Sequence, residues 1–479
     1  MITAIGTVTA APIAASDLAD GIVRHVTVVD VERGRDKADQ AVAWRDGTIV
    51  AVGADAAIAR RWQTAKVVEG RGRYLIPGLW DMHVHFGGGP DLVQENEALL
   101  PLYVANGITT IRDCSGDLPE QVLAWRDAIA RGTLFGPRLL TSGAKLEGLR
   151  PIWKGTIEVG TKADVDAAIA HEKRVGVDFV KITDSTLDPE LFLYAVSRAR
   201  AADLRVSGHI PMQLTVGQAV DAGISSIEHL DYAYKAGVKD EAAIAADFAA
   251  GRIDRTEANR RIDVGFDPAT AMRAYRRLAA SNVFVTPTLN ISEITAHLDE
   301  KRHEDDPYLA YIGPGLRRTY DWRVKRAAGA TPGEIDRRHA RFDRVAAILP
   351  MLRRAGVTIM AGTDAGFLNS FDYPGVGLHD ELALYVKYGL TPAQALASAT
   401  RAGPAWFGEL GRYGAIAPGK AADLVLLDGN PLRSISATRQ IQTVVLRGRM
   451  YDRAGLDAML SSTRAKVAGW NKADQIRRR

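Results

Sequence analysis

Short apolar runs alternate with longer amphipathic segments through most of the chain. Eight of the short runs have a strand-like pattern, are bounded by turns and are separated by helical patterns. Segments between them, such as "DVDAAIAHEKRVG" and "LTVGQAVDAG", repeat their apolar residues at helical spacing, which predicts helices. The predicted strands are residues 78–85, 107–113, 137–143, 178–184, 204–210, 225–231, 282–289 and 356–364.

This alternation predicts an α/β fold with a (β/α)₈ TIM barrel, because this barrel requires eight strands that each lead into a helix. The predicted barrel covers residues 77–415. Two connections within it, about residues 235–280 and 290–355, are long and highly charged, so we expect solvated helices there. The second insertion could form a lid or a subunit contact, and a homo-oligomer is expected.

The two ends of the chain share a different pattern, typical of strands and hairpins. It is seen in "HVTVVDVERG" and "AVAWRDGTIVAVG" near the start, and in "AADLVLLDG" and "IQTVVLRGRMYD" near the end. We therefore predict a small β-sandwich domain built from both chain ends. It comprises residues 1–76 and 416–479, the latter with the C-terminal tail.

The composition is that of an ordinary globular protein, with 47% hydrophobic and 25% charged residues. No apolar run approaches the roughly 18 residues of a membrane span. The 61 basic residues only slightly outnumber the 57 acidic ones and are scattered, so a nucleic-acid partner is not expected. Cys114 is the single cysteine, which excludes an internal disulfide and a cysteine-cluster metal site.

The first residues, "MITAIGTVTAAPIAAS", are small but lack the basic start and sustained apolar core of a signal peptide. We therefore expect a cytoplasmic protein. A periplasmic or secreted protein is the alternative, if a leader has been removed.

The stretch "YLIPGLWDMHVHFGG" carries the first candidate chemistry. His83 and His85 are two residues apart on a predicted strand, so their side chains project to the same face, roughly 7 Å apart along the backbone. That spacing suits two ligands of one metal ion. A pair of histidines on a solvated strand face is the alternative.

Further polar residues lie at or near the ends of other predicted strands: Lys181 in the fourth, His209 in the fifth, His229 in the sixth and Asp364 in the eighth. Taken singly, a lysine in a salt bridge or a histidine in the core explains each of them. Taken together with the histidine pair, they occupy five strand ends of one barrel, the face where such barrels carry their active sites. The pattern therefore predicts a single site.

At these positions the chain resembles the amidohydrolase superfamily of metal-dependent hydrolases. The resemblance rests on "PGLWDMHVH", "DFVKI", "GHI", "IEHLD", "AGTDAG" and the segment from "GLTPAQALASAT" to "AADLVLLDGNPL". The order of ligands, with a lysine in the fourth strand, resembles the branch of prolidases, dipeptidases and ochratoxinase-like enzymes. Lys181 weighs against a mononuclear deaminase, because deaminase-like members lack that lysine.

The resemblance implies two divalent metal ions bridged by a carboxylated lysine. A buried neutral amine can add carbon dioxide and become a carbamate with two oxygen ligands. Zinc is expected, and manganese, cobalt or iron would also suit imidazole and oxygen ligands. One ion would be bound by His83, His85 and Asp364 and the other by His209 and His229, with the Lys181 carbamate shared between them.

The expected reaction is hydrolysis of an amide bond in an N-acyl amino acid or a dipeptide-like substrate. Water that bridges two such ions ionises near neutral pH and supplies the attacking hydroxide. Asp364 is the predicted catalytic residue, because it can take the released proton and pass it to the leaving amine. Weaker candidates for substrate contact are Tyr232, three residues beyond His229, and Arg150 and Trp153, in the loop after the third strand.

Two alternatives stay open at this point. The same site could hydrolyse a cyclic amide, a lactone or a xenobiotic ester, because only the walls of the pocket discriminate among these carbonyls. A non-catalytic scaffold on the same fold is the second alternative, although a scaffold would not need all six ligand positions. In the enzymatic readings the expected partner is a small-molecule substrate.

Overall fold

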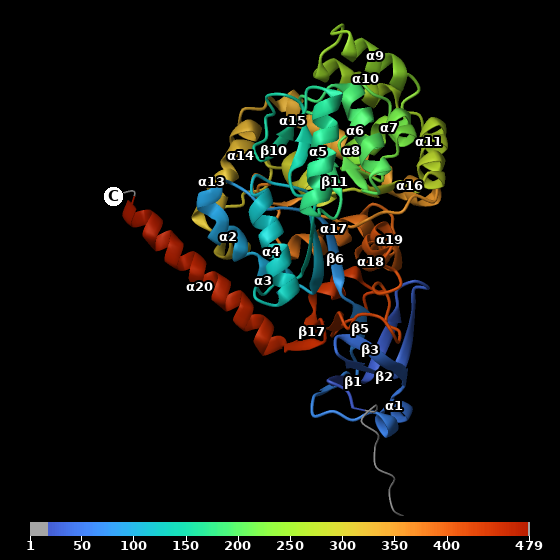
Figure 1. Cartoon of the computed structure of the whole chain (residues 1–479), viewed down its shortest axis with the longest axis vertical. Coiled ribbons are helices and arrows are strands. Elements are labelled where there is room, and N and C mark those ends of the chain that lie inside the picture. The colour runs from blue at the N-terminus through green and yellow to red at the C-terminus, as the bar shows by residue number, and fades with distance from the viewer. Residues whose placement is uncertain (1–17, 478–479) are drawn as a thin grey trace, which may run out of the picture.

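The computed structural model describes residues 18–477. The sequence prediction about the first residues therefore lies outside the described part of the chain. Strands and helices from the middle of the chain form the upper part of the molecule in Figure 1, and strands from both chain ends form the lower part. No helix within residues 18–477 combines the length and the apolar character that a membrane crossing needs.

The middle of the chain forms two sheets in which all pairings are parallel. Their strand orders are β15-β6-β7-β8 and β10-β9-β11-β12-β13-β14. The strands are β6 (Leu79–His85), β7 (Ile108–Asp113), β8 (Arg138–Thr141), β9 (Lys145–Glu147), β10 (Thr156–Glu158), β11 (Val180–Ile182), β12 (Val206–Gly208), β13 (Ser226–Glu228), β14 (Phe284–Thr286) and β15 (Ala365–Gly366).

Backbone hydrogen bonds also connect the two sheets to each other. On one side the Asp178 N–H donates to the Thr141 carbonyl over 2.9 Å. On the other side residues 358–361 lie between β14 and β6, with a parallel bridge from Ile359 to Val285. The chain therefore has a mixed α/β fold in which seven of the eight predicted barrel strands are present as parallel strands.

The eighth predicted strand, residues 356–364, is mostly irregular in the structure. Some of its backbone N–H groups bond outside the sheet. The Thr363 N–H donates to Asp81 Oδ1 over 3.0 Å, and the Ala361 N–H donates to the Ser398 carbonyl over 3.1 Å. Asp364 also has a φ of 73°, in the left-handed region that a strand excludes. The regular pairing with β6 begins only at the following residue, in β15.

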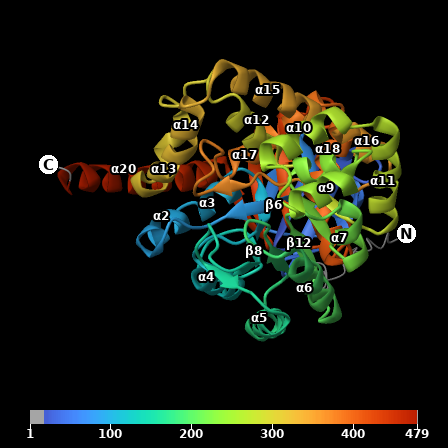
Figure 2. The ribbon, with the colours of Figure 1, turned by 90° about the horizontal axis from the view of Figure 1, so that it is seen from above.

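Helices surround these strands, as the view from above shows (Figure 2). Their starts are set by local capping: Thr161 accepts the Asp164 N–H, and Thr391 forms a capping box with Gln394. The helices outside the two insertions are α2 (Val93–Glu97), α3 (Leu100–Ala105), α4 (Pro119–Arg131), α5 (Lys162–Val175), α6 (Pro189–Ala201), α7 (Val216–Ala222), α17 (Val376–Lys387), α18 (Pro392–Thr400) and α19 (Ala402–Phe407).

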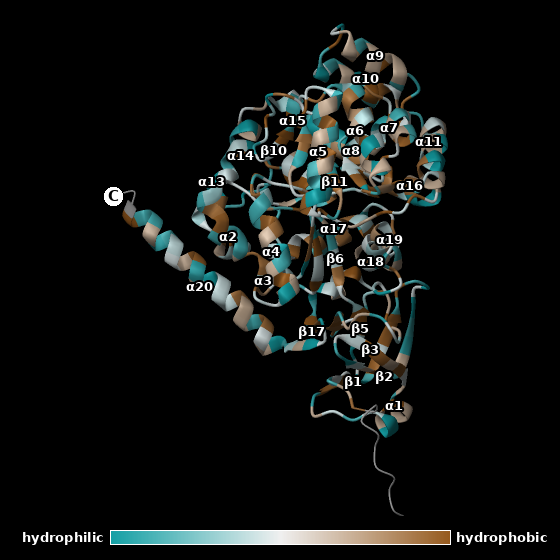
Figure 3. Cartoon of the chain, viewed as in Figure 1, coloured by the Kyte–Doolittle hydropathy of each residue, from teal (hydrophilic) through white to brown (hydrophobic). Residues whose placement is uncertain are grey.

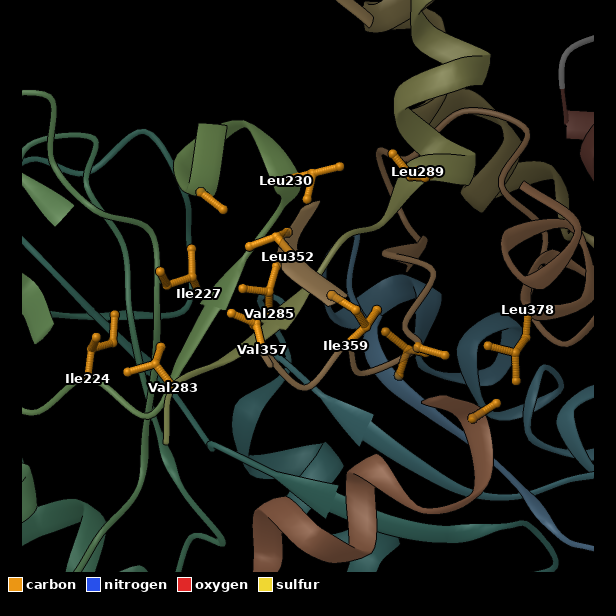
Figure 4. Close-up of a cluster of buried hydrophobic side chains, with 14 of the residues drawn as sticks. Ile224, Ile227, Leu230, Val283, Val285, Leu289, Leu352, Val357, Ile359 and Leu378 are labelled. Atoms are coloured by element: carbon orange, nitrogen blue, oxygen red, sulfur yellow. The ribbon is translucent and has the colours of Figure 1, made fainter. Parts of the chain in front are cut away.

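Apolar side chains from strands and helices form one large core. Ile227 on β13, Val285 on β14 and Ile359 beside them are at most 3% exposed (Figure 4). Leu352 and Leu378 come to the same cluster from helices. Burial of such side chains contributes about 1.5–3 kcal/mol each, so this core fixes where the strand ends lie.

The two charged segments predicted as insertions, together with the residues just before them, contain several helices. The first contains α8 (Leu230–Lys235), α9 (Glu241–Ala249), α10 (Arg255–Gly265) and α11 (Pro268–Ala280), and the second contains α12 (Leu289–Ala296), α13 (Pro314–Thr319), α14 (Asp321–Ala328), α15 (Pro332–Ala346) and α16 (Leu349–Arg354). Figure 3 shows hydrophilic residues on the outer faces of several of these helices.

The strands from the chain ends form one eight-stranded sheet, not two separate sheets. Hydrogen bonds from the Ala422 N–H to Gly47 and from the Ile49 N–H to Lys420 bring distant strands of this sheet together, so the sheet curls around its own apolar side chains. Its order is β18 (Arg449–Asp452), β17 (Ile441–Leu446), β16 (Leu424–Leu427), β5 (Tyr74–Pro77), β1 (Gly21–Asp30), β2 (Arg35–Arg45) and β3 (Thr48–Ala54), and β4 (Val67–Glu69) pairs with β1. The small helix α1 (Asp55–Arg61) follows β3.

The C-terminal tail is a single long helix, α20 (Arg453–Arg477), that leaves this sheet and runs along the side of the molecule (Figure 1). Its Leu456 and Val467 are buried, and Arg464 donates to the Tyr311 hydroxyl over 2.8 Å. The predicted division at residues 76–77 and 415–416 stays a prediction. The curled sheet adds the observation that both chain ends contribute strands to one unit.

Candidate metal centre

The pair of histidines on β6 meets the aspartate that follows the irregular eighth segment. His83 Nε2 lies 3.2 Å from His85 Nε2 and 3.3 Å from Asp364 Oδ1. His85 Nε2 lies 2.8 Å from the same oxygen. Three potential ligand atoms from two segments far apart in sequence therefore converge on one point.

A second group faces the first. His209, one residue beyond β12, and His229, one residue beyond β13, place their Nε2 atoms 3.0 Å apart. Lys181 on β11 is 1% exposed, and its Nζ lies 3.3 Å from His209 Nε2. The ring centroids of His83 and His229 are 5.1 Å apart, so the two groups are in contact. We call the six side chains together the mouth cluster: His83, His85, Lys181, His209, His229 and Asp364.

Hydrogen bonds on the outer nitrogens aim these imidazoles inward. His83 Nδ1–H donates to Glu228 Oε2 over 2.8 Å, and His85 Nδ1–H donates to the Ser115 carbonyl over 2.7 Å. His229 Nδ1 lies 2.8 Å from Thr288 Oγ1. Metal-binding histidines are oriented in this way, because the outer hydrogen bond fixes the tautomer that leaves the inner nitrogen free.

The spacing of the inner atoms fits a metal ion. Ligands roughly 2.0–2.1 Å from a tetrahedral ion lie about 3.3 Å from one another. The distances from His83 Nε2 to His85 Nε2 and to Asp364 Oδ1 agree with that value. Imidazole nitrogen with carboxylate oxygen is also a donor set that suits zinc. The third distance, 2.8 Å from His85 Nε2 to Asp364 Oδ1, is shorter. The three residues together form a candidate site for a divalent metal ion.

The protonation of the cluster suits the same role. Burial, and next the charge of Lys181, lowers the pKa of His83 to about 3. Burial also lowers the pKa values of His209 and His229 below the usual range. Burial opposes ionisation of Asp364, but its interactions with His83 and His85 outweigh burial and hold its pKa below the usual range. Neutral imidazoles and an ionised carboxylate are the forms that bind metal.

The sequence profile of the Amidohydrolase family matches residues 74–451, which is more than half of the chain. The chain belongs to the amidohydrolase family. The resemblance seen in the sequence is thereby confirmed. As a family member the chain is a hydrolase that acts on carbon–nitrogen bonds.

Three relatives illustrate the similarity of this amidohydrolase to known proteins. Ochratoxinase from Aspergillus niger is 24% identical over 90% of this chain and 86% of its own length. The structure of the bottromycin amidohydrolase superposes with a TM-score of 0.71 at 21% identity, over 93% of this chain and 90% of its own. The structure of a Xaa-Pro dipeptidase with bound methionine gives a TM-score of 0.64 at 19% identity, over 90% of this chain and 99% of its own. These structural likenesses support the fold.

Two adjoining cavities open at the mouth cluster of the amidohydrolase. The inner cavity, of about 130 Å³, is lined by five of the six cluster side chains together with Lys145 and Trp153. The outer cavity, of about 350 Å³, extends toward α8, α10 and α12. His229, Arg323 and Asp364 line both cavities, so a substrate could span them.

Of the three predicted substrate contacts, two lie at these cavities. Trp153 lines the inner cavity. Tyr232 lines the outer one, where its hydroxyl donates to Asp184 Oδ1 over 3.0 Å and its ring stacks on His209. Arg150 is exposed, and it is not among the residues that line either cavity; its backbone N–H donates to Glu158. The geometry adds no support for Arg150, and all three roles stay predictions.

The structure also reveals cavity residues that the sequence prediction missed. Asp184 lies two residues beyond β11, and its Oδ1 is 3.6 Å from His209 Nδ1. Its position directly after "VKIT", at the end of a predicted strand, could have identified it as a site residue. Lys145 follows the third strand without any recognised motif. Arg323, on α14, reaches the centre from the second insertion, and its side chain donates to the Leu368 carbonyl over 3.0 Å. Local pattern carries no signal for such a contact.

A layer of paired polar groups lies directly behind the mouth cluster. Arg112 donates to both Glu228 oxygens over 2.8 and 2.9 Å, and the hydroxyls of Ser207 and Ser226 donate to Glu228 Oε1. Asp81 accepts the Thr363 hydroxyl over 2.8 Å. We call this set the base layer: Asp81, Arg112, Ser207, Ser226 and Glu228.

Another group of potential ligands includes Glu228 of the base layer. Cys114 Sγ lies near His83 and Glu228 in a geometry that could enclose an ion. However, burial raises the pKa of the Cys114 thiol to about 12, so it stays protonated. The Glu228 oxygens already accept from Arg112, Ser207 and Ser226. A protonated thiol and an engaged carboxylate are poor ligands.

Proposed function

We propose that this amidohydrolase is a binuclear metal hydrolase that cleaves an amide bond in a small molecule, an N-acyl amino acid or a dipeptide-like substrate. The observation that carries the proposal is the convergence of the mouth cluster. The Nε2 atoms of His83 and His85 and Oδ1 of Asp364 lie within 3.3 Å of one another, and the Nε2 atoms of His209 and His229 lie 3.0 Å apart. The outer nitrogen of each imidazole faces a polar partner.

The proposed ligands divide into two sets. His83, His85 and Asp364 would hold one ion, and His209 and His229 would hold the other. Lys181 would contact both as a carbamate formed with carbon dioxide, and its buried position next to His209 supports that role. Zinc is the proposed metal, with manganese, cobalt or iron as substitutes. Two such ions would supply a water that ionises near neutral pH and would polarise the scissile carbonyl.

The side chains of the protein would move the protons. Asp364 borders both cavities and is ionised, so it can accept a proton from the attacking water and return it to the leaving amine. Its backbone supports this orientation, because the Asn369 amide donates to the Asp364 carbonyl. Asp184 holds Tyr232 and faces His209, which keeps the second imidazole in place.

We also propose that the parallel strands close into a (β/α)₈ barrel. The hydrogen bonds between Asp178 and Thr141, and those of residues 358–361 to β14 and β6, support closure on both sides. In such a barrel the active site lies at the carboxyl ends of the strands. The mouth cluster has this position on β6, β12 and β13.

A hydrolysis screen with the purified protein tests the function. N-acyl amino acids, dipeptides, lactones and aryl esters would be supplied in parallel with zinc, manganese or cobalt. Hydrolysis of the acyl amino acids or dipeptides is expected, and only with metal. Turnover confined to lactones or esters would replace the amide substrate by the alternative, and no turnover of any member with any metal would reject the proposal.

A further inference from the structure

Lys145 is a buried cation in the inner cavity, and within residues 18–477 it has no hydrogen-bonding or ion-pairing partner. It begins β9, is 6% exposed and lines the cavity together with His85, Lys181 and Asp364. Its ammonium lies 5.5 Å from the centre of the Trp153 ring. Within residues 18–477 the ammonium has neither a hydrogen bond nor an ion pair. A buried charge in this state is costly by several kcal/mol unless an anion compensates it.

The carboxylates that act most on Lys145 are Asp113, Glu147 and Asp117, and each accepts hydrogen bonds from other donors. Asp113 Oδ2 accepts the Thr141 hydroxyl over 2.8 Å, and Asp113 Oδ1 has no partner among the described residues. Both oxygens of Glu147 accept backbone N–H groups of the segment from Ser185 to Leu187. Asp117 Oδ1 accepts the N–H groups of Gly88 and Gly89. Within residues 18–477 no carboxylate forms an ion pair with the Lys145 ammonium.

A second buried lysine shows how this chain treats a structural ammonium. Lys235 is 4% exposed, and its Nζ donates to the Pro211 carbonyl over 2.9 Å and to the Leu214 carbonyl over 2.7 Å. Lys145 and Lys235 are similarly buried, but of the two ammonium groups only that of Lys235 donates hydrogen bonds to the described part of the protein. The difference indicates that the partner of Lys145 arrives from outside.

We infer that Lys145 binds a carboxylate of the substrate, so that the enzyme prefers amides with a carboxylate close to the scissile bond. This inference rests on the proposed function and names the substrate class for the same site. An ammonium and a carboxylate form a strong, charge-assisted hydrogen bond in a buried cavity. The Trp153 face adds a favourable cation–π contact that keeps the ammonium in position.

The sizes of the cavities set the orientation of such a substrate. The inner cavity of about 130 Å³ has room for about four water molecules of roughly 30 Å³ each, so it admits a small anionic end. The outer cavity of about 350 Å³ is larger, and its lining is mostly polar with a few apolar residues such as Ile210 and Ile262, so it has room for the bulkier part of the substrate. The carboxylate therefore lies near Lys145, and the larger part of the substrate lies near α10.

Matched substrates test the inference on the full-length, metal-loaded protein. N-benzoylglycine and N-methylbenzamide share the scissile bond and differ only by the carboxylate. Wild type should prefer N-benzoylglycine, and Lys145→Met should lower kcat/KM for it by about a hundredfold while changing N-methylbenzamide hydrolysis less than about threefold. Lys145→Arg should recover part of the preference. Lys154→Met, the same change at an exposed lysine of the same region, should behave as wild type.

Several results would overturn the inference. Equal wild-type rates on the two substrates would do so, as would an equal loss on both in Lys145→Met. A fall in metal content per folded Lys145→Met chain would assign the lysine to the metal centre instead. If Lys145→Met does not fold, the wild-type preference and Lys145→Arg decide.

A binding measurement separates this inference from the proposed function. N-benzoylglycine should raise the thermal unfolding midpoint of wild type and not that of Lys145→Met, and N-methylbenzamide should shift neither by a comparable amount. If metal-loaded wild type hydrolyses neither compound nor any other amide, the proposed function fails while the binding result still decides the role of Lys145. Equal shifts with both compounds would reject the anion site alone.

Discussion

The mouth cluster and the base layer are two buried polar sets in direct contact, since His83 Nδ1 lies 2.8 Å from Glu228 Oε2, yet they differ in how their polar atoms are used. In the base layer, Glu228 accepts from Arg112, Ser207 and Ser226, so its charge is compensated by the protein. In the mouth cluster the inner atoms of His83 and His85 face one another and Asp364. Only the mouth cluster opens to a cavity.

The comparison shows that burial of charged groups does not by itself identify a site. A satisfied set such as the base layer supports the fold and orients the residues above it. A converging set that faces a cavity, with its outer atoms already paired, is prepared to bind something that the chain does not supply. The predictions below separate the two behaviours, from the largest expected effect to the smallest.

Lys181→Ala should break the mouth cluster most severely. Without the proposed shared anion the repulsion between two cations is no longer offset, so metal content should fall below two ions per chain. Activity should drop by about 10⁴-fold, about 5 kcal/mol of lost transition-state stabilisation. Acetate or propionate at high concentration should restore part of it, because a small carboxylate can supply two oxygens.

Lys235→Ala provides the matched control for this experiment. It removes another buried lysine, but one whose ammonium donates to two backbone carbonyls. It should lower the free energy of unfolding and leave metal content per folded chain unchanged. Two tightly held ions in folded Lys181→Ala would end the bridging hypothesis.

Asp364→Asn should separate proton transfer from metal binding within the mouth cluster. The amide keeps an oxygen but accepts no proton at neutral pH, so turnover should fall by about 10³-fold. Metal loss should be smaller than in His83→Ala, which deletes a ligand outright. Near-normal turnover in Asp364→Asn would place the base elsewhere.

Glu228→Gln should damage the base layer and thereby the fold. The change leaves Arg112 buried without its counterion, so the free energy of unfolding should fall by about 3 kcal/mol in denaturant titrations. Asp364→Asn should cost much less stability by the same assay. If the two variants were equally destabilised, the distinction between the base layer and the mouth cluster would not hold.

Glu172 is a buried carboxyl outside both sets, and it should make the free energy of unfolding depend on pH. It is 1% exposed, its Oε2 has no hydrogen-bond partner among the described residues, and burial raises its pKa from 4.5 to about 8. The folded protein therefore keeps a proton that the unfolded chain loses above about pH 4.5, and stability should fall as the pH rises from about 4.5 to about 8.

Glu172→Gln cannot ionise and should remove this part of the pH dependence. At pH 8.5 the variant should be more stable than wild type by about 1 kcal/mol, with little difference at pH 4. Urea unfolding at the two pH values measures it. A wild-type stability advantage at pH 8.5 would show that Glu172 is ionised and paired.

The sequence carries enough information to predict the strand ends and the residues that meet there. Strand alternation puts His83 and His85 on one face, and the parallel order of the strands brings His209 and His229 to the same end. The family motifs add Lys181 on β11 and Asp364 at the end of the eighth predicted strand. The structure brings all six positions of the mouth cluster together.

Features that depend on distant contacts could not be predicted in this way. Arg323 lines both cavities from α14, in the second insertion. The sequence pattern does not predict where the helices of an insertion lie relative to the strands. The eighth segment looks like a strand, but Asp81 takes one of its backbone N–H groups, and only the folded chain shows this. In the loop after the third strand no periodicity distinguishes Trp153, which faces the cavity, from Arg150, which does not.

The most direct test of the central claim is a metal titration of the purified protein. Chelator-treated protein, verified as metal-free, would receive zinc in steps while bound metal and amide hydrolysis are measured together. The account predicts no turnover without metal, and activity that rises to its maximum at two ions per chain. Undiminished hydrolysis by metal-free protein would contradict the mechanism, and full activity at one ion per chain would contradict the binuclear centre.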